Sequence, residues 1–175
     1  MTNQQHVKFE ELAVMNQRGF GWGLLLQGSE TTVDVLKCVV KECGGDGMCV
    51  REGATVIATQ CEFMENGGSG VFCCDANTKA RLYDCQMHHN GQHGLWAHDD
   101  AVVDLHGTKT DMHSNKVRGI YASSHGKVNI HLPSQHNTTH DNVGGDRHQW
   151  NGGSIANINA DGTFTHVVVE EEDDY

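Results

Sequence analysis

Apolar residues recur along the chain in short groups about 24 residues apart. A glycine precedes each of five apolar triplets, and these glycines are separated by 24, 23, 24 and 25 residues: Gly23, Gly47, Gly70, Gly94 and Gly119. The first residues of the triplets are Leu24, Met48, Val71, Leu95 and Ile120. Side chains alternate between the two faces of a strand, so the first and third residues of a triplet share one face. The pattern predicts strands that stack through a common apolar face.

Each unit contains two further short apolar segments. In the second segment, a polar residue usually separates two apolar ones. The apolar positions begin with Val33, Val56, Ala80, Val103 and Val128. The residues that follow them are mostly polar, so we expect them to face solvent: Asp34, Ile57, Arg81, Asp104 and Asn129. The third segment contains Val40, Phe63, Met87 and Met112. Repeats of this size are typical of solenoids, in which each unit buries its apolar side against its neighbours. We therefore predict an all-β, single-stranded parallel β-helix of about six rungs, with three short strands per rung.

The repeat extends almost to both ends of the chain, which predicts one domain over residues 1–169. Residues 1–22 form the N-terminal rung, because Val7-x-Phe9 matches Val33-x-Val35. Residues 23–150 form the core rungs. Residues 151–169 form a C-terminal cap, a hairpin that turns at Asp161-Gly162. Residues 170–175 are predicted to be a disordered acidic tail.

The units, of which Thr55 to Val71 is the clearest, resemble the right-handed parallel β-helix repeats of the pectate-lyase-like superfamily. They are most similar to the short repeat arrays of some F-box proteins, bacterial periplasmic sugar-related proteins, and algal or viral proteins. The resemblance covers roughly residues 20–130 and implies a right-handed coil. The superfamily contains lyases, hydrolases, adhesins and inert scaffolds, so the resemblance implies a fold and no particular activity.

Charge and composition exclude several classes of function. The net charge of −11 repels phosphate backbones, so we expect no nucleic-acid partner. No apolar stretch approaches the roughly 18 residues that cross a bilayer, so we expect no membrane span. The N-terminus lacks the features of a secretory signal, and the seven cysteines are an odd number. We therefore expect an intracellular protein with reduced thiols and no cofactor.

Two columns of equivalent residues are interpreted as structural ladders. The asparagine column contains Asn66, Asn90 and Asn115, with Asn142 as its next member. Stacked amides can bond to the next rung at a bend, where strand pairing is interrupted. The inward cysteine column contains Cys38, Cys61 and Cys85. Their spacing allows a disulfide, but three thiols leave one unpaired, so we favour buried free cysteines that pack as small apolar residues.

A histidine column contains His88, His113 and His140. Imidazoles about 5 Å apart could share a transition metal or titrate together. Histidine is also a common polar residue at exposed turns, and we favour that interpretation.

The outward row of the first strands contains Leu25, Phe72, Trp96 and Tyr121. An exposed aromatic stripe suits a protein partner or a sugar. We favour a protein, because the residues beside the stripe show no consistent hydrogen-bonding pattern.

The best catalytic candidates are acids that follow the first strands: Glu52, Asp75, Asp99 and Asp100. Hydrolases of this fold need acids that converge on one groove, whereas solvated acids are normal at turns. We therefore consider catalysis less favoured than a structural or protein-interaction role, with self-association into a homo-oligomer. The alternative is a carbohydrate-binding or carbohydrate-active protein.

Overall fold

A computed structural model of the chain describes residues 6–17, 19–131 and 138–166. These residues form twenty strands, β1 to β20, in three sheets. Sheet A contains β1 (His6–Glu10), β4 (Thr32–Leu36), β7 (Thr55–Thr59), β10 (Lys79–Tyr83), β13 (Val102–His106), β16 (Lys127–His131), β19 (Ser154–Ile158) and β20 (Phe164–His166). Sheet B contains β2 (Ala13–Met15), β5 (Val39–Lys41), β8 (Glu62–Met64), β11 (Gln86–His88), β14 (Asp111–His113) and β17 (Thr139–His140). Sheet C contains β3 (Leu24–Gln27), β6 (Met48–Arg51), β9 (Val71–Cys73), β12 (Leu95–Ala97), β15 (Ile120–Ser123) and β18 (Arg147–Trp150).

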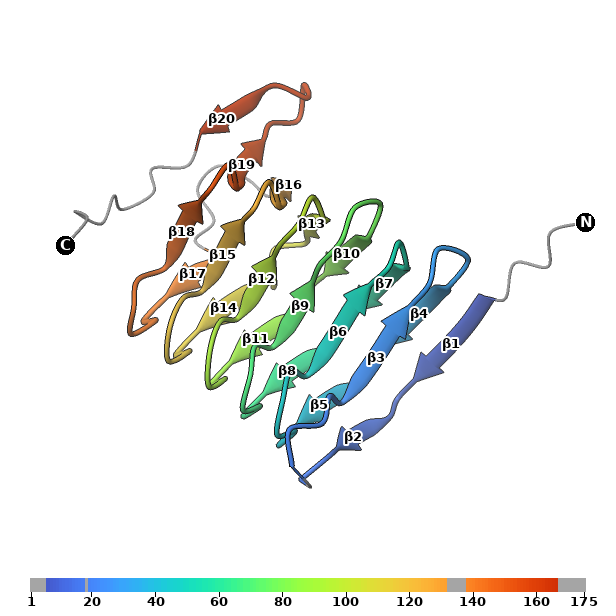
Figure 1. Ribbon diagram of the computed structural model, residues 1–175. Helices are drawn as coiled ribbons and strands as arrows, with labels where there is room; N and C mark the ends of the chain where they lie inside the picture. The colour runs from blue at the N-terminus through green and yellow to red at the C-terminus, as the bar shows by residue number, and fades with distance from the viewer. Residues whose placement is uncertain (1–5, 18, 132–137, 167–175) are drawn as a thin grey trace, which may run out of the picture.

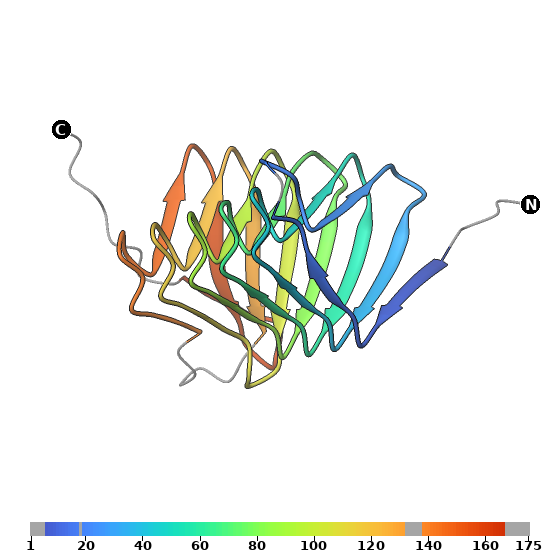
Figure 2. The ribbon, with the colours of Figure 1, turned by 90° about the horizontal axis from the view of Figure 1, so that it is seen from below.

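Every third strand pairs in parallel, so the chain coils through the three sheets in turn (Figure 1). The register follows the sequence period, with Val56 beside Val33 and Ala80 beside Val56. The first turn follows it too, because Val7 pairs with Val33. Figure 2 shows the stack from below, with the two termini at opposite ends. The predicted all-β solenoid of about six rungs with three strands per rung is confirmed.

The interior of the coil is filled by the inward columns. Phe63, Met87, Leu82 and Leu95 are among its largest side chains, and all have an exposed fraction of 0%. Burial of a side chain of this size contributes about 1.5–3 kcal/mol. Because equivalent positions stack directly, each inward residue packs against its counterparts in the rungs above and below.

The corner between sheets B and C is built from a left-handed residue followed by an asparagine. Glu65, His89 and Ser114 have φ angles of 55°, 56° and 55°, an arrangement that costs roughly 1–2 kcal/mol for a residue with a side chain. The asparagines that follow them offset this cost through hydrogen bonds between rungs. Their Nδ2 atoms donate to the next Oδ1 over 3.1, 3.0 and 2.9 Å, in a ladder through Asn66, Asn90, Asn115 and Asn142.

The glycine that precedes each first strand is explained by the same ladder. A Cβ atom at Gly94 would lie 2.8 Å from the carbonyl oxygen of Gly119 and 2.9 Å from Nδ2 of Asn115. These distances are too short for any side chain. The glycine spacing that marks the repeat therefore reflects close packing of backbone against the asparagine ladder.

The corner between sheets A and B holds the cysteine column. Cys38, Cys61 and Cys85 are buried, with exposed fractions of 2% or less, as predicted for an inward row. All seven cysteines are free thiols, and six of them are buried. The Cys61 Sγ atom donates to the Val35 carbonyl oxygen of the preceding rung, at 3.3 Å.

The C-terminal hairpin caps one of the three sheets. β19 and β20 pair antiparallel, with Ile158 opposite Phe164. The connecting turn contains Asp161 and Gly162, and Gly162 has a φ of 80°. The predicted cap is confirmed for residues up to His166, whereas the end of the predicted cap and the predicted tail over 170–175 lie outside the described residues. Across the described ranges, no helix is long and apolar enough to span a membrane.

Candidate functional site

The predicted aromatic stripe forms on sheet C, but its rings cover one another. Phe72, Trp96 and Tyr121 are aligned in adjacent strands. The Phe72 and Trp96 ring centroids are 4.7 Å apart, and those of Trp96 and Tyr121 are 5.7 Å apart. All three side chains are half-buried rather than exposed as we expected. Leu25 is 39% exposed, but Cys49 separates it from the rings and is only 2% exposed. The stripe is therefore an interrupted and largely self-covered surface.

The predicted histidine column forms a stack on sheet B. The ring centroids of His88 and His113 are 4.8 Å apart, those of His113 and His140 are 5.1 Å apart, and both pairs are nearly parallel. Both ring nitrogens of His88 and of His140 are occupied by local hydrogen bonds. His88 Nε2 lies 2.8 Å from Glu62 Oε1, and His140 Nε2 lies 3.0 Å from Asp111 Oδ2. The predicted stacking is therefore confirmed. The ring nitrogens of His88 and His140 bond to carboxylates on the surface of the same sheet.

The shared environment shifts two pKa values of this stack in opposite directions. Burial, followed by the neighbouring His88 imidazole, lowers the pKa of His113. Hydrogen bonds to Asp141 and Asp111 raise the pKa of His140. His113 and His140 therefore do not titrate together.

The four candidate acids lie in the turns that lead from sheet C to sheet A. Glu52, Asp75, Asp99 and Asp100 have φ angles of 56°, 75°, 45° and 63°. Asp75 Oδ2 accepts a hydrogen bond from the Glu52 backbone N–H at 3.0 Å. Asp99 Oδ1 lies 3.3 Å from His98 Nε2. The contacts of Asp75 and Asp99 are thus with neighbouring turn residues, and Asp75 stabilises the preceding turn in the stack.

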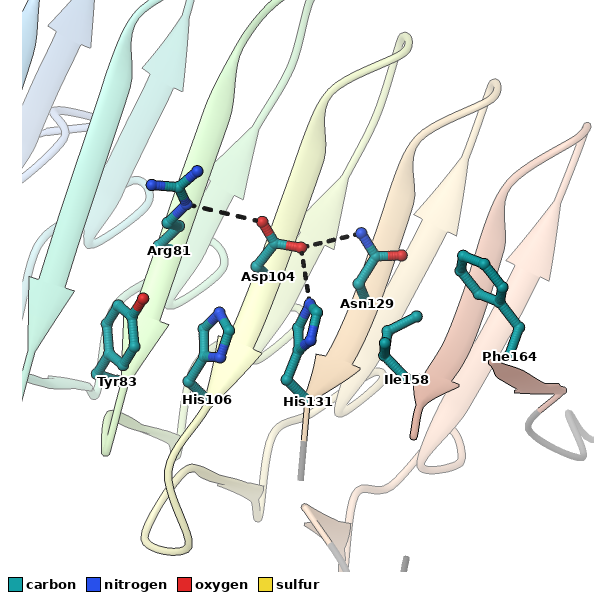
Figure 3. Close-up of a pocket in the computed structure, with 8 residues that line it drawn as sticks. All are labelled: Arg81, Tyr83, Asp104, His106, Asn129, His131, Ile158 and Phe164. Carbon is teal, nitrogen blue, oxygen red and sulfur yellow. Dashed lines mark hydrogen bonds and ion pairs between the residues drawn. The ribbon is translucent and has the colours of Figure 1, made fainter. Parts of the chain in front are cut away.

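A groove that was not among the predicted sites lies on the outward face of sheet A. It has a volume of about 420 Å³ and opens to solvent. Strands β10, β13 and β16 form its floor, and the C-terminal hairpin forms one wall (Figure 3). Its lining residues are Arg81, Tyr83, Asp104, His106, Asn129, His131, Ile158 and Phe164.

One row of the groove is a stack of three rings. The Tyr83 and His106 centroids are 4.5 Å apart with 11° between their planes, and those of His106 and His131 are 4.4 Å apart with 14°. Strand register aligns these side chains on adjacent rungs. Because the rings lie face to face, they turn their edges toward the groove, and the imidazole edges carry the nitrogen atoms.

The second row centres on the Asp104 carboxylate. Its Oδ1 atom accepts a hydrogen bond from Asn129 Nδ2 at 2.9 Å and lies 3.2 Å from His131 Nε2. Its Oδ2 atom lies 3.9 Å from Arg81 Nε. Figure 3 shows these three contacts converging on the one acid.

The imidazole of His106 makes no side-chain hydrogen bond to another described residue. Its pKa is lowered by burial and by repulsion from His131, while Asp104 acts in the opposite direction. The potential ligand atoms of Asp104, His106 and His131 all lie within 4.8 Å of one another. No other group of three such residues is this close within the ranges that the structure describes.

The sequence contains a signal for this groove in the outward positions of sheet A. Arg81, Asp104 and Asn129 were predicted to lie on the solvent face, and they do line the groove. Two residues further along each strand the same face continues, and those positions are Tyr83, His106 and His131, which were not predicted as a site. The wall formed by Phe164 has no such signal, because the hairpin is outside the repeat.

The N-terminal end of the solenoid carries most of the exposed apolar surface. Strands β1, β2 and β3 are the edges of their three sheets. Six of the nine large exposed apolar residues among the described ranges belong to this end: Val7, Leu12, Met15, Phe20, Trp22 and Leu25. Phe20 is the most exposed, at 95%.

Comparison with known proteins identifies the repeat and nothing more specific. A family model described as a right-handed β-helix region matches residues 1–164. This match confirms the resemblance to right-handed β-helix repeats and the handedness that it implied. No curated protein matches the chain, and no solved structure matches it.

Proposed function

The chain belongs to the right-handed β-helix family, and we propose that it is a non-catalytic interaction module that self-associates through its N-terminal end. The observation that carries this proposal is the concentration of exposed apolar side chains on the three edge strands β1, β2 and β3 and on the segments that connect them. Unpaired strand edges offer free backbone donors and acceptors to another chain. Apolar patches add the free energy of burial to such pairing.

A second copy of the chain is the partner that fits this end best. The three edges surround one apolar interior, so full pairing needs a partner with three strands in the same arrangement. Another copy provides that arrangement and can form an isologous dimer about a two-fold axis. The opposite end is less suited, because β20 already pairs with β19 at the C-terminal edge of sheet A. These features favour a head-to-head dimer over a head-to-tail filament.

The test is the mass of the particle in solution. We expect light scattering coupled to gel filtration to give twice the mass of one chain. Phe20→Asp should weaken the dimer by about 100-fold, because the loss of roughly 1.5 kcal/mol of apolar burial in each of two copies sums to about 3 kcal/mol. Val143→Asp is the matched control, since Val143 is 81% exposed and lies away from this end.

Two results would contradict the proposal. One is a monomeric wild-type protein at concentrations up to about 200 µM, well above the micromolar range of ordinary dimers. The other is a Phe20→Asp protein that dimerises as well as Val143→Asp. A dimer lost in Phe164→Asp but kept in Phe20→Asp would also contradict it and would indicate contact between two C-terminal ends, because Phe164 lies in the C-terminal hairpin.

Sugar binding in the groove of sheet A is the second candidate. Arg81, Asp104 and Asn129 are polar groups suited to hydroxyls, and they lie beside Tyr83 and Phe164. Against this, sugars stack on ring faces, whereas Tyr83 and His106 cover each other's faces. A glycan array with the wild-type protein and Arg81→Ala separates the candidates: a signal lost in that variant would support sugar binding.

A further inference from the structure

We propose that Asp104, His106 and His131 form a binding site for a divalent first-row transition cation, with Zn²⁺ as its representative. The site lies on the outward face of sheet A, within the groove of Figure 3. Two imidazoles and one carboxylate are ligand types that such cations accept. The inference does not depend on self-association through the N-terminal end.

The distances place the three ligands near the geometry that the metal needs. Their ligand atoms all lie within 4.8 Å of one another. Zinc binds nitrogen and oxygen at about 2.0–2.2 Å, so tetrahedral ligand atoms are roughly 3.3–3.6 Å apart. Adjustments of about 1 Å through side-chain torsions would bring the three atoms onto one ion.

The stacked rings present the correct part of the imidazole to the groove. The lone pair of an imidazole nitrogen lies in the plane of the ring and points outward from its edge. Because His106 and His131 stack with 14° between their planes, each directs an edge rather than a face into the open space. This geometry disfavours sugar stacking and favours metal coordination.

The neighbours of Asp104 are placed to orient it as a ligand. Asn129 donates a hydrogen bond to Oδ1 over 2.9 Å, and such contacts commonly position metal-binding carboxylates. The hydrogen bond between Asp104 and His131 would be replaced by coordination of both residues to the ion. Arg81 opposes a cation by its charge, but it lies 3.9 Å from Oδ2 and its side chain is 52% exposed, so it can turn into solvent.

The other histidine stack is a poorer site. His88 and His140 use ring nitrogens in hydrogen bonds of 2.8 and 3.0 Å with carboxylates of the same sheet. His106 has no corresponding side-chain hydrogen bond within the described parts of the chain. Metal binding at the groove therefore breaks one hydrogen bond and displaces the Arg81 ion pair, whereas binding at the other stack would break several hydrogen bonds.

Three protein ligands leave a coordination position that faces the groove. In zinc sites with three protein ligands, the fourth position holds water or an exchangeable ligand. The groove is about 420 Å³, which gives room for a small molecule with one donor atom. The site would thus serve to hold a metal together with a small anionic or neutral ligand.

The experiment is a calorimetric titration of metal-free, untagged full-length protein with Zn²⁺, accompanied by Co²⁺ absorption spectra. We expect one site per chain and visible absorption bands of four-coordinate Co²⁺. Asp104→Asn keeps the shape of the side chain and should weaken binding by at least about tenfold, as should His106→Ala. His113→Ala is the matched control in the other stack and should bind as the wild type does.

Several outcomes would overturn the inference. These are no binding of Zn²⁺ by the wild-type protein, equal binding by wild type and Asp104→Asn, or loss of binding in His113→Ala alone. Far-ultraviolet circular dichroism of each variant checks folding. If His106→Ala fails to fold, Asp104→Asn decides the question, because it changes one oxygen to nitrogen on a side chain that is partly exposed.

Discussion

The asparagine ladder is predicted to be a major source of stability for the coil, and Asn90→Ala tests it. The Asn90 side chain has an exposed fraction of 0% and makes four hydrogen bonds. Its Oδ1 atom accepts from the backbone N–H and the Nδ2 atom of Asn66, at 3.2 and 3.1 Å. Its Nδ2 atom donates to the Phe63 carbonyl oxygen and to Asn115 Oδ1, at 3.1 and 3.0 Å.

The magnitude follows from the groups that lose their partners. Alanine leaves the Asn66 backbone N–H without its acceptor in a buried corner, at a cost of about 1–3 kcal/mol. The loss of the remaining side-chain bonds adds about 1–2 kcal/mol. We therefore expect a total loss of about 2–5 kcal/mol in the free energy of unfolding, which corresponds to a decrease in melting temperature of roughly 4–20 °C for a chain of this size.

The assay is thermal unfolding followed by far-ultraviolet circular dichroism. Gln92→Ala is the control, because Gln92 is an exposed amide in the same rung and should change stability by less than about 0.5 kcal/mol. Equal melting temperatures for Asn90→Ala and Gln92→Ala would refute the reasoning. That result would mean that strand pairing alone supports the corner.

Three further predictions concern the core, the pH dependence and the thiols. Met87→Ala should cost about 2–5 kcal/mol, because the side chain is fully buried; a loss below about 1 kcal/mol in denaturant unfolding would contradict this. Burial, together with Arg118, lowers the pKa of His93 from 6.5 to about 4. The stability associated with neutral, buried His93 is fully present above pH 6.5. It is lost as the pH falls from 6.5 through 4, by up to about 3 kcal/mol. His93→Gln should flatten this part of an acid titration of stability. Burial and the nearby Asp75 raise the pKa of the half-buried Cys74 thiol to about 12. Iodoacetamide at neutral pH should therefore modify the native protein slowly, and it should modify all seven cysteines only after denaturation. Rapid labelling of Cys74 in the native protein, seen by mass spectrometry, would count against this.

Most of the fold could be predicted because the sequence has two periodicities, one within each strand and one between rungs. Alternation along each strand separates inward from outward residues, and the period of about 24 residues aligns equivalent positions in adjacent rungs. The pairing of Val56 with Ala80 and the stacking of His88 on His113 both follow from this alignment. Even the asparagine ladder follows from it, since one residue type recurs at one corner.

The candidate site was predicted less completely, for a different reason. Register places Phe72 beside Trp96 but does not say whether their rings cover each other, and the structure shows that they do. On the polar face of sheet A, the sequence predicted the outward row that contains Asp104. It did not predict the next outward row, two residues further along each strand, which contains Tyr83 and His106. Counting the period to the end of each strand would have revealed that row.

The sequence by itself determined the coil, its core columns and its ladders, because in-register parallel stacking brings each residue against its own equivalents. Only the tertiary structure decided which ring nitrogens form hydrogen bonds, which three side chains contact Asp104 and where the hairpin places Phe164. These features depend on side-chain torsions and on antiparallel pairing outside the repeat, and periodicity does not specify either of them.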